Sequence, residues 1–343
     1  MKDGILIRKV DQFKEKEDKM RKNLLPGLLI LVFILVSAEA AFPWGAATHA
    51  FLAKKIGRYY LTLDFQEIYG QLAPDLFNFN SELSSDPVLW AFTHGLPGNE
   101  GFMTVWEKAT YRNYQKALAF GFVAHNDVWG ADFTAHHQAQ TIPAPADFPL
   151  VPGEIEPGYV VIKAVALNSD PTLNSHFESI GLHNDRPEHF RLRLKLCHYL
   201  VEAAGDLIIR RVDQNIGQNL ITAAVVRDRK FVELLVQALN QPEYNQALIE
   251  NEAFFRRLMI QYGALMVLPE FRAARALAES AAYFGLNLIK KEAGIEVPLE
   301  QAETIADYGL KKAIQLCAPD YLPEIRKTIE KVRLELRNHN IRY

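Results

Sequence analysis

The segment from His125 to His136 has the greatest capacity for chemistry in this chain of 343 residues. On one continuous helix, with about 100° of rotation per residue, His125, Asp132 and His136 would share a narrow face. Asp127 would lie on the opposite side, and His137 would lie off the face. Imidazoles and carboxylates that share a buried face need a partner charge, and a divalent metal ion supplies one. The spacing therefore predicts a metal-binding face.

A second pair of candidate ligands, His198 and Glu202, stands four residues apart. This spacing places both side chains on one helical face, and the flanking Leu196, Leu200 and Val201 indicate that the face is buried. A His–Glu pair at this spacing commonly forms an ordinary hydrogen bond, so the pair alone does not predict a metal site. Nitrogen and oxygen ligands without thiolate suit zinc, among other first-row ions.

The elements that would position these residues read as helices. Apolar residues recur at spacings of three and four over 104–138, 187–212, 217–240, 243–264, 271–293, 298–317 and 321–338. Two irregular stretches, 141–158 and 168–187, interrupt the pattern, and long loops of this kind are often functional. The sequence predicts a single all-α, multi-helix domain. Within it we expect a metal-binding catalytic core over 41–215, with the helices of 216–343 packed on that core or forming a second all-α subdomain.

Composition and charge exclude several classes of protein. The chain is 49% hydrophobic and 23% charged, with a mean hydropathy of −0.07, which excludes a disordered chain and a polytopic membrane protein. The formal net charge of −3 provides no global basic field to attract nucleic acid. Cys197 and Cys317 can form at most one disulfide and no cysteine-based zinc site. The sequence contains no P-loop, dinucleotide fingerprint or serine nucleophile elbow.

The first 40 residues have the pattern of an export signal. A charged stretch from Met1 to Lys22 precedes an apolar run from Leu24 to Val36, and Ser37-Ala38-Glu39-Ala40 follows as a small-residue cleavage site. A permanent membrane anchor is the less favoured alternative, because a spanning helix needs about 20 apolar residues. We expect residues 1–40 to be a signal peptide and the mature protein to be periplasmic or extracellular.

The order of the motifs resembles that of a known enzyme superfamily. Asp75, which follows a proline as residues that open a turn often do, and His94 indicate little when taken alone. The motifs follow the chain in the order Trp44-Gly45-x-x-x-His49, Ala73-Pro74-Asp75, Thr93-His94, His125…Asp132…His136 and His198-x-x-x-Glu202. This order resembles the zinc-dependent phospholipase C and S1/P1 nuclease superfamily over residues 44 to about 206. The resemblance implies an all-helical, secreted phosphodiesterase with a three-zinc cluster.

The resemblance also implies a role for each candidate ligand. Its three zinc sets are Asp75, His94, His125 and Asp132; His136, His198 and Glu202; and Trp44 and His49 with Asp132 bridging. Asp75 is in addition the candidate for orienting or deprotonating the attacking water. The expected content is two or three zinc ions per chain.

Two departures from the family pattern leave alternatives open. The family spaces its His and Asp four residues apart, but that position here is Trp129, so we prefer Asp132 as the ligand and keep Asp127 as its rival. The family's tryptophan binds through a free α-amine. Cleavage after Ala40 would leave three residues in front of Trp44, and the third set would then be incomplete.

Three functions fit the pattern. The first is phospholipase-C-like hydrolysis of a lipid headgroup phosphodiester by metal-activated water, with peripheral contact to a membrane. The second is cleavage of single-stranded nucleic acid. It is less favoured because the chain without residues 1–40 has 30 basic and 35 acidic side chains and no basic stretch near the motifs. The third is a helical metal-binding protein without catalytic activity.

Overall fold

The computed structural model describes residues 44–57, 62–80, 82–96, 98–110, 113–145, 148 and 157–342. Within these ranges every regular element is a helix, apart from one isolated bridge between Leu96 and Asn99. The all-α prediction is confirmed. The expected signal peptide and most of the proline-rich stretch 141–158 lie outside the described residues.

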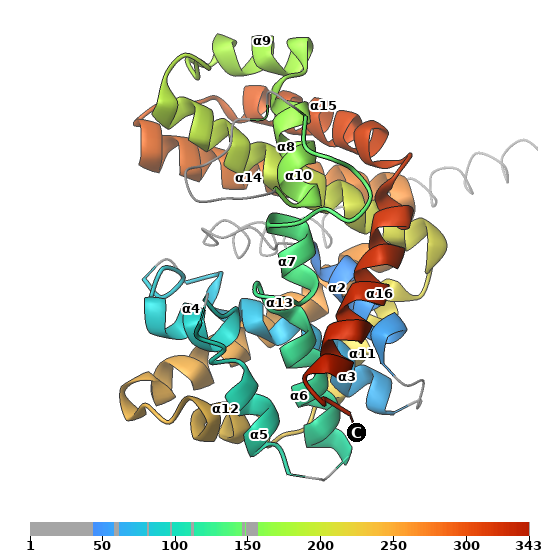
Figure 1. The fold of residues 1–343 in the computed structure, drawn as a ribbon. Helices are drawn as coiled ribbons and strands as arrows, with labels where there is room; N and C mark the ends of the chain where they lie inside the picture. The colour runs from blue at the N-terminus through green and yellow to red at the C-terminus, as the bar shows by residue number, and fades with distance from the viewer. Residues whose placement is uncertain are drawn as a thin grey trace, which may run out of the picture.

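The elements fall into two halves along the chain (Figure 1). The first half contains α2 (Ala46–Ile56), α3 (Leu63–Leu72), the 3-10 helix η1 (Ala73–Phe77), α4 (Pro87–Thr93), α5 (Met103–Lys108), α6 (Asn113–His125) and α7 (Ala131–His136). The second half contains α8 (Tyr159–Asn168), α9 (Pro171–Ser179), α10 (Pro187–Val212), α11 (Ile216–Val226), α12 (Phe231–Leu239), η2 (Pro242–Tyr244), α13 (Asn245–Val267), α14 (Glu270–Ala293), α15 (Leu299–Cys317) and α16 (Tyr321–Asn338).

The prediction of one helix over 104–138 was wrong, because the chain breaks there into α5, α6 and α7. The second break follows from Asn126, whose side-chain Oδ1 accepts hydrogen bonds from the backbone N–H groups of Val128, Trp129 and Gly130. An Asn side chain that satisfies nearby amides in this way replaces helical hydrogen bonds with a turn. Gly130 is required in that turn, because a Cβ there would lie 2.5 Å from the carbonyl oxygen of His125.

Two other boundaries differ from the prediction. The helix expected over 217–240 is divided by a turn, in which Asp228 accepts a hydrogen bond from the backbone N–H of Lys230. The stretch 168–187, expected to be irregular, contains α9. That helix begins because Asp170 accepts hydrogen bonds from the amides at its first turn and Pro171 occupies its first position.

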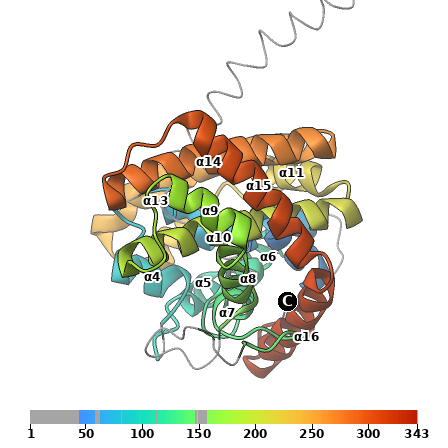
Figure 2. The same cartoon turned by 90° about the horizontal axis from the view of Figure 1, so that it is seen from above.

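One hydrophobic core joins both halves of the chain. The long helix α10 packs against α2, α8, α14 and α15, and Figure 2 shows α14 and α15 crossing over it. Two helices of the second half pack on the first half: α11 packs against α2 and α3, and α16 runs past α2 and α7 (Figure 1). The helices after residue 215 therefore cover the segment that carries the candidate ligands.

A close crossing of α3 and α6 positions two of those ligands. A Cβ at Gly70 would lie 2.0 Å from the carbonyl oxygen of Leu118, and one at Gly121 would lie 2.1 Å from that of Glu67. Only glycine permits this approach of the two backbones. It brings the C-terminal end of α6 against the junction of α3 and η1.

None of the helices in the described residues combines the length and the apolar character needed to cross a membrane. Cys197 and Cys317 are buried and are not joined to each other, so the single disulfide allowed by the sequence is not formed.

Candidate metal centre

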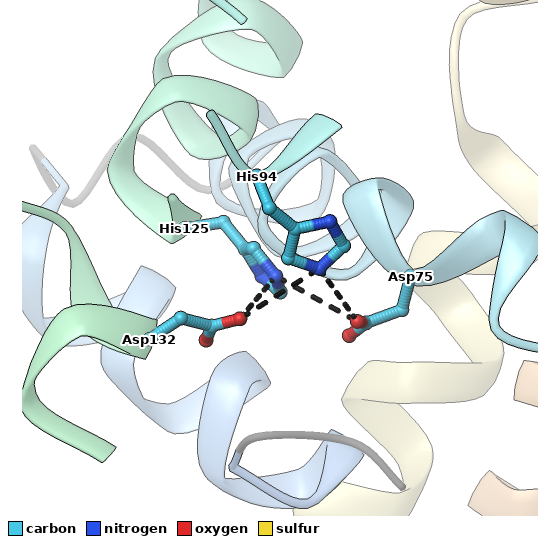
Figure 3. A group of neighbouring side chains, drawn as sticks. All are labelled: Asp75, His94, His125 and Asp132. Atoms are coloured by element: carbon cyan, nitrogen blue, oxygen red, sulfur yellow. Dashed lines mark hydrogen bonds and ion pairs between the residues drawn. The ribbon is translucent and has the colours of Figure 1, made fainter. Parts of the chain in front are cut away.

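Four side chains from separate segments converge at a buried point, which we call the primary cluster: Asp75, His94, His125 and Asp132 (Figure 3). They come from η1, the residue after α4, the last residue of α6 and the first turn of α7. One ligand atom from each lies within 4.8 Å of the others, so the group could hold a metal ion.

The imidazole and carboxylate groups of the primary cluster face each other directly. His125 Nε2 lies 2.7 Å from Asp132 Oδ2 and 3.7 Å from Asp75 Oδ1. His94 Nε2 lies 3.4 Å from Asp75 Oδ1 and 3.8 Å from Asp132 Oδ2. All four side chains are 1% exposed or less, so the interactions form almost without water.

His49 extends the primary cluster on the other side of Asp132. Its Nε2 atom lies 3.3 Å from Asp132 Oδ1, and its ring stacks on that of His125 at 4.4 Å between centroids. The two oxygens of Asp132 thus face different imidazoles. Trp44 is buried beside this region, where its indole donates to the carbonyl of Ala131. Whether its main-chain atoms bind an ion stays a prediction.

Hydrogen bonds at Nδ1 orient the imidazoles of the primary cluster. His125 Nδ1 donates to the carbonyl oxygen of Gln71 at 2.8 Å. His94 Nδ1 donates to Thr93 Oγ1 at 2.8 Å, because the Thr93 hydroxyl gives its own proton to the carbonyl of Leu89. In both histidines Nε2 is the ring nitrogen that faces the carboxylates. Metal-binding histidines typically have this arrangement.

The pKa values reflect this burial and close charge. Burial alone lowers the pKa of His125, but the carboxylates of Asp132 and Asp75 outweigh it and raise that pKa to about 9. Burial raises the pKa of Asp132, and the His125 and His49 imidazoles outweigh it and hold that pKa below its usual range. Burial and the charges of Asp75 and Asp132 raise the pKa of Glu202 well above normal. The buried carboxylates of Asp75, Asp132 and Glu202 therefore lie close together, with only the neighbouring imidazoles to supply positive charge.

Unpaired polar atoms show that the residues fit a cation. Asp75 Oδ2, both oxygens of Asp132, His125 Nε2 and both ring nitrogens of His49 are buried without a hydrogen-bond partner among the described residues. His125 and Asp132 are within ion-pair distance but do not have the geometry of a hydrogen bond. Native proteins rarely leave such atoms unsatisfied, so their convergence suits an ion that accepts lone pairs from all of them.

A second group of candidate ligands lies beside the first. His198 Nε2 is 2.8 Å from Glu202 Oε1, and the rings of His136 and His198 lie 5.4 Å apart. Glu202 Oε1 is another buried atom without a hydrogen bond. Burial and the neighbouring His136 lower the pKa of His198 to about 3, so this imidazole is neutral and able to bind a metal.

The structure adds Asp127 to this second group. His136 Nδ1 lies 3.1 Å from Asp127 Oδ1, and His137 Nε2 lies 3.4 Å from the same oxygen. The expectation that Asp127 lies opposite His136 was wrong, because it assumed a continuous helix, whereas α6 ends at His125. The expectation that His137 stands apart from these residues was wrong for the same reason. Asp127 makes no pair with His125, so Asp132 is the carboxylate of the primary cluster.

Sequence reasoning missed Asp206, which anchors the helix that bears His49. Gly45 provides no capping side chain for α2, and Asp206 accepts hydrogen bonds from the N–H groups of Ala47 and Thr48 instead. These are the amides that an N-cap residue normally satisfies. The only signal in the sequence was its position four residues after Glu202 on α10.

Comparisons of the chain with protein-family models, with curated proteins and with solved structures found no match. The resemblance to the phospholipase C and S1/P1 nuclease superfamily therefore rests on this chain's own residues.

Proposed function

We propose that this protein is an exported, zinc-dependent phosphodiesterase that hydrolyses a lipid headgroup phosphodiester in the manner of a phospholipase C. The observation that carries the proposal is the convergence of Asp75, His94, His125 and Asp132 from four segments into a buried cluster with unpaired polar atoms. The donors are imidazole nitrogen and carboxylate oxygen without thiolate, which suits zinc.

The proposed ligands divide into three sets. The primary cluster would hold one zinc ion, and the pair His198–Glu202 with His136 would hold a second. His49 and Asp132, with the main chain of Trp44 when its amine is free, would hold the third. Bound zinc would supply Lewis acidity and positive charge to a phosphodiester and to its leaving oxygen.

Asp75 is the proposed proton acceptor of the reaction. Its Oδ1 accepts a hydrogen bond from Asn78 Nδ2 at 2.7 Å and faces His94, whereas its Oδ2 has no hydrogen-bond partner. Oδ2 is therefore the atom free to take a proton from an attacking water. Asn78 holds the carboxylate in place, since it lies one turn further along at the end of η1.

The substrate class follows from charge. The net charge of the whole chain is −3, and the sequence has no Arg/Lys-rich stretch near the motifs. Proteins that bind nucleic acid mainly through its phosphates carry a clustered basic surface. A single phospholipid headgroup does not require such an extended basic surface, so a phospholipid is the favoured substrate.

Hydrolysis assays on zinc-loaded protein test this proposal. We expect release of the chromogen from a choline-ester phosphodiester, no comparable cleavage of single-stranded DNA, and loss of activity in Asp75→Asn. Faster cleavage of DNA would show a nuclease instead. Bound zinc without either activity would show a metal-binding protein that is not an enzyme.

A further inference from the structure

Asp127 lies in a turn that the tertiary structure holds firmly in place. Its backbone N–H donates to the carbonyl oxygen of His94 at 2.8 Å, which ties the turn to the residue after α4. Asn126, beside it, caps three following amides of the same turn. The Asp127 side chain is only 9% exposed. A carboxylate that is buried at a fixed point needs a specific partner.

That partner is His136. Asp127 Oδ1 faces two imidazole nitrogens, one of His136 and one of His137. An ionised carboxylate oxygen can only accept hydrogen bonds. Since Asp127 Oδ1 lies 3.1 Å from His136 Nδ1, that nitrogen carries the proton. The Nε2 atom of His136 is left as the one with a lone pair for a metal.

The primary cluster uses the same arrangement twice. His94 donates from Nδ1 to Thr93, and His125 donates from Nδ1 to the carbonyl of Gln71. In each case an oxygen atom that does not face the cluster holds Nδ1, and Nε2 points at the carboxylates. His136 is a third histidine whose Nδ1 is held by an oxygen atom, here that of Asp127, and its ring lies beside that of His198.

We propose that Asp127 is a positioning residue for the second metal ion, which it serves by fixing the tautomer and the ring orientation of His136. The Nε2 atom of His136 then joins His198 and Glu202 as a ligand. Outer carboxylates of this kind typically contribute 10–100-fold to metal affinity. The inference rests on the metal centre of the proposed function and not on its substrate.

His137 offers a matched control. Its Nε2 lies 3.4 Å from the same Asp127 oxygen, but its side chain is 39% exposed. If an ion instead sat directly among Asp127, His136 and His137, then His137 would be a ligand. The proposal excludes this, because Asp127 uses Oδ1 to hold a proton on His136. His137→Gln should therefore retain the affinity of the wild type.

Zinc titration against a chelator of known affinity is the main experiment, using the full chain. Asp127→Ala should bind one ion about 10–100-fold more weakly, with the tighter ion unchanged. Asp127→Asn should rescue binding to within a few-fold of wild type, because its amide oxygen still accepts from Nδ1. Unchanged affinity in Asp127→Ala would overturn the proposal. Weakening in His137→Gln equal to that in Asp127→Ala would also overturn it.

Nitrogen NMR of the metal-free wild type gives a readout that needs neither a variant nor activity. At a pH where the His136 ring is neutral, its proton should reside on Nδ1, as it should in His94 and His125. A proton on Nε2 of His136 would overturn the proposal even if Asp127→Ala failed to fold. The expected zinc results without phosphodiesterase activity would reject the proposed function and leave this inference standing. An active phosphodiesterase whose zinc affinity is unchanged in Asp127→Ala would support the proposed function and reject this inference.

Discussion

The metal-free protein should lose stability as the pH rises through the range in which His125 gives up its proton. The pKa of His125 is raised from 6.5 to about 9 in the folded protein. A raised pKa stabilises the fold fully below the unfolded value, and this contribution is lost as the pH rises through the folded value. Because each pKa unit is worth about 1.4 kcal/mol, the loss amounts to about 3 kcal/mol. The source is the carboxylate of Asp132, 2.7 Å from His125 Nε2.

Urea unfolding of chelator-treated protein at about pH 6 and about pH 9.5 measures this loss. Asp132→Asn removes the largest attraction that raises the pKa of His125, so the difference between the two pH values should shrink by most of that amount. His176→Gln removes a histidine on α9, outside both groups of ligands, and should leave the difference as in the wild type. Equal pH dependence in wild type and Asp132→Asn would refute the reasoning.

Zinc-reconstituted protein should contain two or three ions per chain, and chelation should lower its melting temperature because bound metal stabilises the folded state; mass spectrometry that finds fewer than one ion would contradict this. Asp206→Ala should destabilise the protein by about 1–3 kcal/mol in urea unfolding, because it leaves the buried amides of Ala47 and Thr48 without acceptors; a change below about 0.5 kcal/mol would show that water replaces the carboxylate. A form that begins at Trp44 should bind one more zinc ion than a form that begins at Ala41, whereas equal metal content in the two would show that the Trp44 amine is not a ligand.

Local spacing predicted the part of the site that lies within one helix. His198 and Glu202 are four residues apart on α10, and they are in contact in the structure. The helices over 187–212 and 321–338 were also predicted from periodicity with accurate bounds. In these segments the hydrogen bonds of the backbone are local, so the pattern of apolar residues was sufficient.

The sequence correctly paired His125 with Asp132, but the structure brings them together in a different way from the one expected. The two residues were assigned to one face of a helix, but the helix ends at His125 and Asp132 begins the next one. The side chain of Asn126 causes this break by accepting hydrogen bonds from three backbone amides. The periodicity of apolar residues does not reveal the effect of a single capping residue. The same break brings Asp127 to His136, which the helical wheel had placed on opposite sides.

The sequence by itself therefore determined the all-α class and the His198–Glu202 pair, because both depend on contacts between neighbours in the chain. The motif order singled out Asp75 and His94 only through resemblance, since neither residue has a local partner that indicates chemistry. Their meeting with His125 and Asp132 was decided by tertiary structure. It depends on the close crossing of α3 and α6 and on a turn held to the carbonyl of His94. Contacts of this kind join residues far apart in the chain, and no spacing rule within one helix encodes them.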